Sequence, residues 1–189
     1  MSARRSVVYT RTGDDGTTGL FHGGRVAKDA AGPAAYGAVD EAVSALGVAR
    51  AEAERDDELH TILLQLQREL FVVAAELSTA PERRDRLQPE VTLVTPAMVE
   101  RLEPLIDDVT ARFEPPREFV VPGENRVAAV LDVARTVVRR AEREAVAARA
   151  AGWLGTDSSV VPYLTRLADL VYTLARWQEG AWRPLHERS

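Results

Sequence analysis

The chain has 189 residues, 46% of them hydrophobic, which suits one folded domain and is not typical of a disordered protein. Its formal net charge of -5 gives no basic surplus of the kind that nucleic-acid binders carry, and the absence of cysteine excludes disulfides and thiolate metal sites. No apolar run approaches the roughly 20 residues that cross a bilayer, and Met1 to Tyr9 hold no apolar signal-peptide core, so we expect a cytoplasmic protein with neither a membrane nor a nucleic-acid partner.

Residues 1–32 hold half of the chain's 12 glycines, with threonines and aspartates between them. This composition favours turns and close backbone approach over helix. Backbone amides and hydroxyls in such a segment can surround an anion, and Arg25 and Lys28 could add charge. The segment lacks the Gly-Lys-Ser/Thr of a Walker A loop, so both a phosphate site and a plain surface loop stay open. Its central run is Thr10-Arg11-Thr12-Gly13-Asp14-Asp15-Gly16-Thr17-Thr18-Gly19.

Five later stretches have apolar residues at three- and four-residue spacing and predict helices. A second apolar stripe, through Leu64 and Phe71, places the second helix at the centre of a bundle. Pro33 suits a first helical turn, and Thr95 before Pro96 is typical of an N-cap followed by proline at the first position. The helices are expected at about 33–50, 57–77, 95–109, 126–151 and 159–180.

The connections are short, apart from a charged, proline-containing loop at 79–93. The apolar segment Phe119–Gly123 could form a strand, but no second strand is expected to pair with it. The sequence therefore predicts an all-α protein: a single antiparallel five-helix bundle at 33–180, preceded by an irregular Gly/Thr-rich segment, with 1–189 as one domain.

Two arginines of the fourth helix, Arg135 and Arg139, lie four residues apart on one face, with Glu142 on the next turn. Like charges at this spacing repel, and a bound polyanion would relieve the repulsion. A solvated face balanced by Glu142 and Glu144 is the more common alternative.

Other polar residues say less by themselves. Asp40 lies near the start of the first helix, where the helix dipole favours a carboxylate. Arg166 and Asp169 are spaced as an ordinary surface pair. The three histidines, His22, His60 and His186, have no ligand spacing, so we expect neither a zinc site nor a Ser-His-Asp triad.

Six segments, taken together and in order, resemble the propanediol-utilisation type of ATP:cob(I)alamin adenosyltransferase over nearly the whole chain. Each motif is weak alone, but their joint occurrence on the expected elements is specific. The segments are Thr10–Gly16 (family T-K-T-G-D-x-G), Gly24–Asp29, Ala35–Glu41 (A-Y-G-x-V-D-E), Phe119–Gly123 (F-x-x-P-G), Ala134–Arg143 (A-R-x-x-x-R-R-A-E-R) and Tyr163–Asp169 (Y-L-N-R-L-S-D).

The resemblance implies ferritin-like up-down helix packing and a homotrimer with active sites between subunits. It implies that ATP and Mg²⁺ bind where the N-terminal segment of one chain meets the arginine helix of the next, and that the product serves an adenosylcobalamin-dependent enzyme. Arg135 would pair across the interface with Asp40, and Phe119 would face the corrinoid and help strip cobalt of its lower ligand. Arg139, oriented by Glu142, would hold ATP. The full set for ATP is Thr10, Arg11, Thr12, Gly13, Asp14, Gly16, Thr18, Arg25, Lys28, Arg139, Glu142 and Thr165.

Four residues in three motifs depart from the family pattern. Thr165 replaces the asparagine of Y-L-N-R-L-S-D, Glu124 replaces the second glycine of P-G-G, and Ala42-Val43 replaces leucine-asparagine. These departures leave open a divergent, non-catalytic paralogue that binds nucleotide or corrinoid for delivery or sensing. A purely structural helical oligomer is a third possibility.

Overall fold

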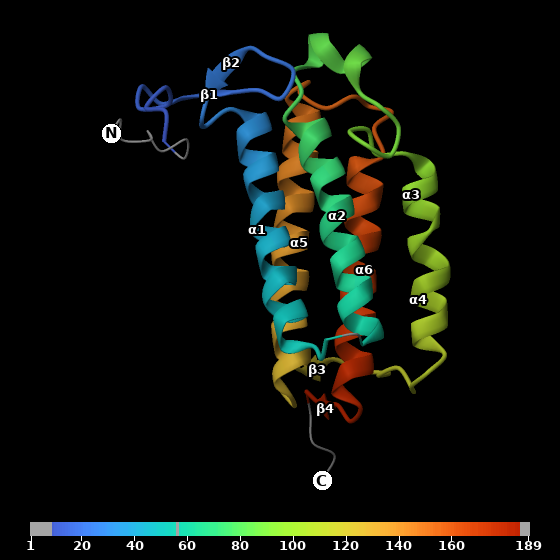
Figure 1. Ribbon diagram of the computed structural model, residues 1–189. Coiled ribbons are helices and arrows are strands. Elements are labelled where there is room, and N and C mark those ends of the chain that lie inside the picture. Colours follow the sequence, from blue (N-terminus) through green and yellow to red (C-terminus); the bar gives the residue numbers. More distant parts are fainter. Residues whose placement is uncertain (1–8, 56, 186–189) are drawn as a thin grey trace.

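The computed structural model describes residues 9–55 and 57–185. Four long helices lie side by side in alternating directions, with two short helices along one side (Figure 1). The long helices are α1 (Ala31–Glu52), α2 (Glu58–Leu77), α5 (Arg126–Ala150) and α6 (Val160–Glu179), and the short ones are α3 (Pro96–Glu100) and α4 (Leu102–Thr110). The predicted all-α class and up-down packing are confirmed.

The third predicted helix is divided at Arg101 into α3 and α4. Pro104 explains the break, because its missing N–H cannot bond to the carbonyl of Glu100 and its ring would clash with that carbonyl. Thr95 is the N-cap residue as predicted, but its side chain does not cap the helix. Its hydroxyl donates to Glu90 Oε1 at 3.3 Å instead.

Side-chain caps set the starts of two long helices. The Asp57 carboxylate accepts from the amide of Glu58 at 2.6 Å, and the Asn125 side chain accepts from the amide of Ala128 at 2.9 Å. The predicted loop at 79–93 contains a short 3₁₀ helix, Pro81–Arg86. Among the residues that the structure describes, no helix is both long and apolar enough to cross a membrane.

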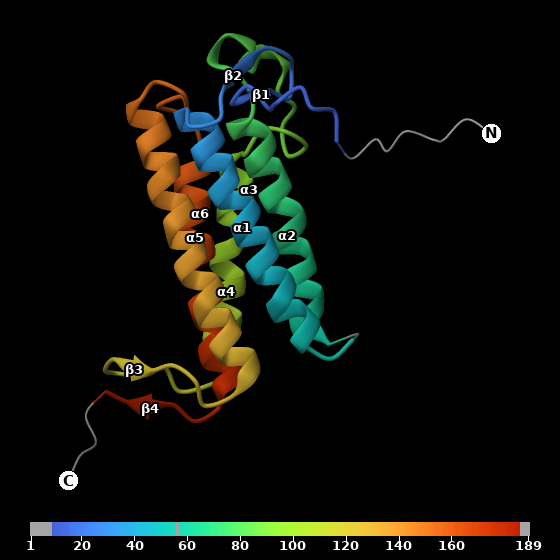
Figure 2. The ribbon, with the colours of Figure 1, turned by 90° about the vertical axis from the view of Figure 1, so that its left-hand side faces the viewer.

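Two small antiparallel sheets lie at opposite ends of the bundle (Figures 1 and 2). At the end that we call the head, β1 (Thr17–Gly19) pairs with β2 (Arg25–Ala27). At the other end, the foot, β3 (Val120–Val121) pairs with β4 (Arg183–Pro184), Val120 opposite Pro184. The Phe119–Gly123 segment therefore does find a strand partner, close to the carboxyl end of the described chain.

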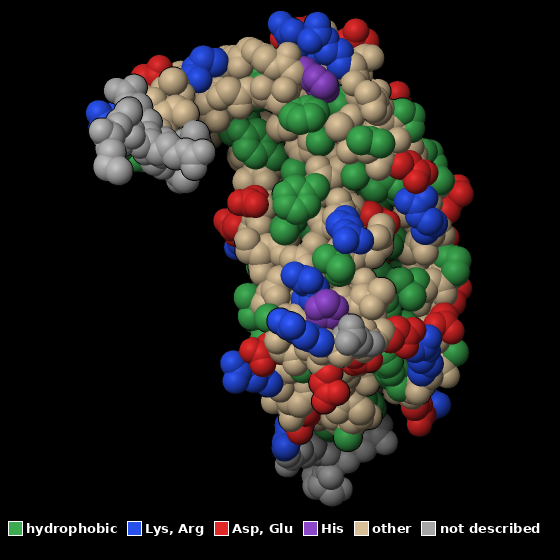
Figure 3. All heavy atoms as spheres, viewed as in Figure 1, with side chains coloured by type: hydrophobic (Ala, Val, Ile, Leu, Met, Phe, Trp, Pro, Cys, Tyr) green, Lys and Arg blue, Asp and Glu red, His purple; other side chains and the backbone are tan. Residues whose placement is uncertain are grey.

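The core runs the length of the bundle and is built from leucine, valine and alanine on the facing sides of α1, α2, α5 and α6. Phe71 does not belong to it, since 62% of this side chain is exposed. The expectation that a second apolar stripe buries α2 at the centre is thus wrong within one chain. Apolar side chains gather instead on the upper part of the face formed by α1 and α2 (Figure 3).

Candidate active site

The N-terminal loop, residues 10–28, extends from the head and leaves a hollow between itself and the bundle (Figure 3). Its shape depends on hydrogen bonds among its own side chains. The Asp15 carboxylate accepts from the amide of Thr17 at 2.9 Å and from its hydroxyl at 2.7 Å. Arg25 Nε donates to the same hydroxyl at 3.1 Å, and the Arg25 guanidinium also bonds the carbonyl of Thr12. Arg25, predicted to contact ATP, thus also ties the two ends of the loop together.

The Thr17 hydroxyl and amide, and then the Arg25 charge, hold the pKa of Asp15 below its usual value, so this carboxylate is ionised at neutral pH. Lys28 lies across the loop. A Cβ added to Gly13 would come within 3.4 Å of Lys28 Nζ and 3.0 Å of the Thr17 carbonyl oxygen, so any larger residue here would require the Thr17 backbone to shift. Gly16, at φ +82°, makes the turn before β1. The loop therefore presents one ammonium group above a tight glycine turn.

The remaining predicted loop residues lie around this turn. Thr10 and Thr12 join their hydroxyls at 2.7 Å, and the Arg11 guanidinium lies 5.7 Å from the centre of the Tyr9 ring. Asp14 is exposed, and Thr18 is partly buried within β1. These groups are available at the surface of the loop.

Two predicted ATP residues meet between α5 and α6. The Thr165 hydroxyl donates to Glu142 Oε1 at 2.6 Å. Arg139 is exposed on α5, and its guanidinium has no hydrogen-bond or ion-pair partner in the described part of the chain. Within this chain Glu142 bonds Thr165 and makes no ion pair with Arg139, so the orientation of Arg139 by Glu142 stays a prediction for the ATP-bound state.

Asp40 and Arg135 are not paired within the chain. Asp40 is exposed on α1, and the α1–α5 ion pair beside it joins Glu41 to Arg140. Arg135 Nε lies 3.8 Å from Asp132 on its own helix. The pairing of Asp40 with Arg135 stays a prediction for two different subunits.

A cavity of about 500 Å³ opens at the foot. It brings together Phe119 and Arg135, which the motifs singled out separately. The Phe119 ring is 83% exposed, so an aromatic face stands free at the cavity wall. The lining comes from the β3 segment, α5 and α6: Pro116, Arg117, Glu118, Phe119, Val120, Pro122, Asp132, Arg135, Tyr172 and Arg176.

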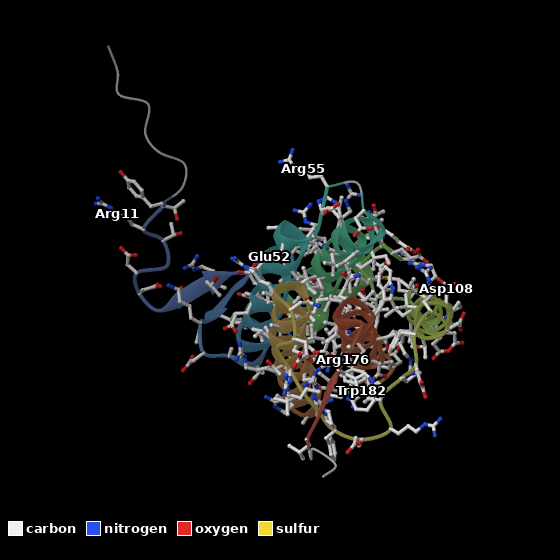
Figure 4. The ribbon with its side chains drawn as sticks, turned by 90° about the horizontal axis from the view of Figure 1, so that it is seen from below. Arg11, Glu52, Arg55, Asp108, Arg176 and Trp182 are labelled. Atoms are coloured by element: carbon white, nitrogen blue, oxygen red, sulfur yellow. The ribbon has the colours of Figure 1, made fainter. Side chains whose placement is uncertain are left out.

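The α6 side of this cavity is built on buried charges. The Arg176 side chain is only 1% exposed, bonds the carboxylate of Asp132 and lies 3.0 Å from Glu179 Oε2. Its guanidinium also faces the ring of Tyr172, 5.3 Å from the ring centre. Burial raises the pKa of Glu179 while Arg176 opposes the rise. Arg176 lies at the foot, with Trp182 close by in the view from below (Figure 4).

Sequence reasoning missed Asp132, Tyr172 and Arg176 as cavity residues. A signal was available, because Asp132 and Arg176 are charged residues inside the apolar patterns of two core helices. The pattern could not show that these two residues pair, because they lie 44 positions apart in the sequence.

The N-terminal loop at the head and Phe119 at the foot cannot come together within one chain. Helix α5 has 25 residues and runs from foot to head. At 1.5 Å per residue it spans about 37 Å. The N-terminal loop and Phe119 are therefore separated by most of the length of the bundle (Figure 2). Among the described residues, no three His, Cys, Asp or Glu side chains gather as a metal site.

This chain is similar to known proteins over nearly its whole length. Residues 8–178 match the family model described as Cobalamin adenosyltransferase. The chain is 40% identical over 193 residues to the corrinoid adenosyltransferase of Mycobacterium tuberculosis (strain H37Rv), covering 100% of this chain and 99% of the relative. It is 38% identical over 172 residues to the Bacillus subtilis corrinoid adenosyltransferase, covering 89% and 84%.

Solved structures of similar proteins have the same fold as this chain. A phenylalanine-to-histidine variant of a PduO-type ATP:corrinoid adenosyltransferase from Lactobacillus reuteri, complexed with cobalamin and ATP, superposes with a TM-score of 0.80 at 28% identity, covering 91% of this chain and 90% of that chain. An arginine-to-lysine variant complexed with ATP gives a TM-score of 0.81 at 26% identity, covering 95% and 100%. The match along residues 8–178, the 40% identity and the shared fold together show that this chain belongs to the cobalamin adenosyltransferase family.

Proposed function

We propose that the protein transfers the 5′-deoxyadenosyl group of ATP to the cobalt of cob(I)alamin, giving adenosylcobalamin and triphosphate. The observation that carries the proposal is the foot cavity, where a free aromatic face and an arginine line a space between α5, α6 and β3. In this chemistry Co(I) supplies the electron pair that forms the cobalt–carbon bond to C5′. The C5′–oxygen bond breaks, and its electrons leave with triphosphate. No general base is needed, which fits a cavity in which none of the described lining residues is a histidine.

The protein's own residues have three tasks in such a reaction. The two reactants must be aligned, the departing polyanion must be stabilised by cations, and water must be kept from cobalt. Arg139 has an unpaired guanidinium, and Lys28 an ammonium above the glycine turn, so we assign them to the phosphates. Mg²⁺ would enter with ATP as part of the substrate complex. Phe119, exposed at the cavity wall, would cover the lower face of the corrinoid.

The active site is proposed to be composite, in a homotrimer. The length of the bundle keeps the N-terminal loop from the Phe119 of its own chain, so the loop would act with the foot and arginine helix of a neighbour. Asp40, exposed on α1, is then available to Arg135 of the next subunit.

A second feature supports the assembly. An apolar cavity of about 310 Å³ lies between α1 and α5, and two of its residues, Val48 and Val133, are 53% and 59% exposed. A subunit contact would cover them. Light scattering at working concentration tests the assembly, and a monomer would contradict it.

The test of activity is an anaerobic assay with ATP, magnesium and chemically reduced cobalamin. We expect the cob(I)alamin spectrum to convert to that of adenosylcobalamin, with one triphosphate released per conversion. No conversion, under conditions where a known corrinoid adenosyltransferase is active, would refute the proposal. A cytoplasmic location and handover of the product to an adenosylcobalamin-dependent enzyme remain sequence-based predictions.

One observation favours an alternative. Thr165 has a single hydroxyl, and it donates to Glu142, so this position offers no free amide donor to ATP. A non-catalytic paralogue would bind ATP or corrinoid without turnover, whereas a structural oligomer would bind neither. Calorimetric titration with Mg-ATP, run beside the activity assay, separates the three.

A further inference from the structure

A chain of largely buried charges forms part of the lining of the foot cavity, and Asp132 is at its centre. Its two carboxylate oxygens face different arginines: Oδ2 accepts from Arg176, and Oδ1 lies 3.8 Å from Arg135 Nε. Asp132 and Arg135 are three residues apart on α5, so the helix fixes their relative position. One buried acid therefore serves two cations that line the same cavity.

Arg176 holds the Asp132 carboxylate in place. Its guanidinium cannot lose its proton, and a buried cation needs a charged partner. Glu179 at 3.0 Å and the Tyr172 ring hold Arg176 from its other sides. The Asp132 carboxylate is thus anchored by a residue on a different helix, α6.

Arg135 is the less constrained of the two arginines. Its side chain is partly exposed to the cavity, and its Nε is buried without a hydrogen-bond acceptor. Asp132 is the one acid within ion-pair distance of Arg135 in the described chain. Without Asp132, Arg135 would have several rotamers available until the proposed contact with Asp40 of the partner subunit or the substrate itself ordered it.

We infer that Asp132 is a positioning residue: anchored by Arg176, it holds the guanidinium of Arg135 at the wall of the foot cavity beside Phe119, ready for the corrinoid. The inference rests on the proposed function, because it assigns the cavity to that substrate. Asp132 itself needs no contact with the corrinoid. Its effect must pass through Arg135, which makes the idea testable.

The test is a double-mutant cycle with Asp132→Asn and Arg135→Met. The readouts are the dissociation constant for cob(II)alamin at saturating ATP, followed by absorbance without oxygen, and the KM for cob(I)alamin. We expect Asp132→Asn to weaken corrinoid binding about tenfold, as for loss of one interaction with a charged group. In the Arg135→Met background the same change should have almost no effect. Equal losses in both backgrounds would show that Asp132 is merely structural and would overturn the inference.

A second variant covers the case in which Asp132→Asn does not fold. Asp132→Leu combined with Arg176→Met and Glu179→Gln removes all three buried charges together, and replacing a whole buried ion network in this way is often neutral or stabilising. Arg135 still loses the acid on its own helix, so corrinoid binding should weaken as before. Corrinoid affinity equal to that of the unmodified protein in this folded triple variant would also overturn the inference.

The matched control is Glu69→Gln. Glu69 is an equally buried carboxylate that accepts from the Tyr163 hydroxyl at 2.8 Å, and it lies outside the foot cavity. This variant should lose stability but keep its corrinoid affinity, and an equal loss of affinity would count against a specific role for Asp132. The unmodified protein is measured first. If the unmodified protein binds and converts cob(I)alamin but the effects of Asp132→Asn and Arg135→Met on corrinoid binding simply add, only the inference fails. If the unmodified protein does not convert cob(I)alamin, the proposed function fails.

Discussion

The head and the foot of the bundle are held together in opposite ways. At the tip of the N-terminal loop the side-chain bonds join exposed residues close in sequence, such as Asp15, Thr17 and Arg25, and only the base of the loop is tied to the bundle, where Arg83 donates to the His22 carbonyl at 3.1 Å. At the foot the bonds cross the chain: Asn125 Nδ2 donates to the Gln178 carbonyl at 2.7 Å, and Arg183 Nε donates to Glu124 Oε1 at 2.8 Å. We therefore expect the tip of the loop to rearrange at a lower free-energy cost than the foot.

This difference matches the two substrates proposed for the site. A loop with few buried contacts opens at low free-energy cost, which suits a nucleotide that must enter and a triphosphate that must leave. A cavity built on buried ion pairs keeps its shape, which suits a reaction that must exclude water from cobalt. Glu124, a departure from the family pattern, contributes to this rigidity through Arg183 on β4.

The largest expected effect is a loss of stability when the buried ion pairs at the foot are broken. Arg176→Ala should lower the free energy of unfolding by about 3–5 kcal/mol, because it leaves Asp132 buried without its main partner. Arg25→Ala in the N-terminal loop should not shift the unfolding midpoint measurably, since its ion pair with Asp15 is exposed. Urea unfolding followed by circular dichroism compares the two variants, and equal midpoints would abolish the distinction between head and foot.

The next largest effect is a loss of catalytic efficiency without a loss of stability. Arg139→Ala should lower kcat/KM by about ten- to hundredfold, the loss of a charge-assisted bond that strengthens in the transition state. The unfolding midpoint should be unchanged, because Arg139 is exposed and unpaired in the described chain. Arg149→Ala, in the last turn of α5, is the control and should be nearly silent. Full activity in Arg139→Ala together with a loss in Arg149→Ala would show that the arginines of α5 are wrongly assigned.

The loop itself should respond to nucleotide. Adding Mg-ATP should slow amide hydrogen exchange across residues 10–28, because the loop depends on its own exposed hydrogen bonds until a ligand orders it. Exchange across the centre of α6 should stay the same. Mass-spectrometric hydrogen exchange reports both segments, and an unchanged loop at saturating Mg-ATP would contradict the prediction.

The smallest effect is a pH dependence at the head of the bundle itself. The Glu76 carboxylate accepts from the Val94 amide at 2.8 Å and the Ser158 hydroxyl at 2.5 Å, yet burial raises its pKa above the ordinary 4.5. The folded state then binds the proton more tightly than the unfolded state. The stability contribution of Glu76 is therefore full below pH 4.5 and falls as the pH rises through the raised pKa.

Glu76→Gln removes this titration. The free energy of unfolding of the unmodified protein minus that of the variant should decrease above pH 4.5, by about 1.4 kcal/mol per unit of pKa difference. Urea unfolding at a series of pH values measures the difference. A difference that grows with pH would mean that the hydrogen bonds of Glu76 outweigh its burial.

Much of the bundle could be predicted from the sequence, because helix periodicity and caps are local. The spacing of apolar residues located α1, α2, α5 and α6 to within a few residues. The glycine content of residues 1–32 indicated an irregular segment, and the six motifs in order identified the family. Arg135, Arg139 and Phe119 were singled out from motifs alone.

Other features depended on contacts between residues distant in sequence, which no local pattern carries. The strand partner of Val120 is Pro184, 64 positions later. The buried pair of Asp132 with Arg176 exists only because α5 packs against α6. Phe71 shows the converse, since its place in an apolar stripe indicated burial while the packing of one chain leaves it exposed. Periodicity determines which residues share a helix face, whereas only the tertiary structure decides what that face contacts.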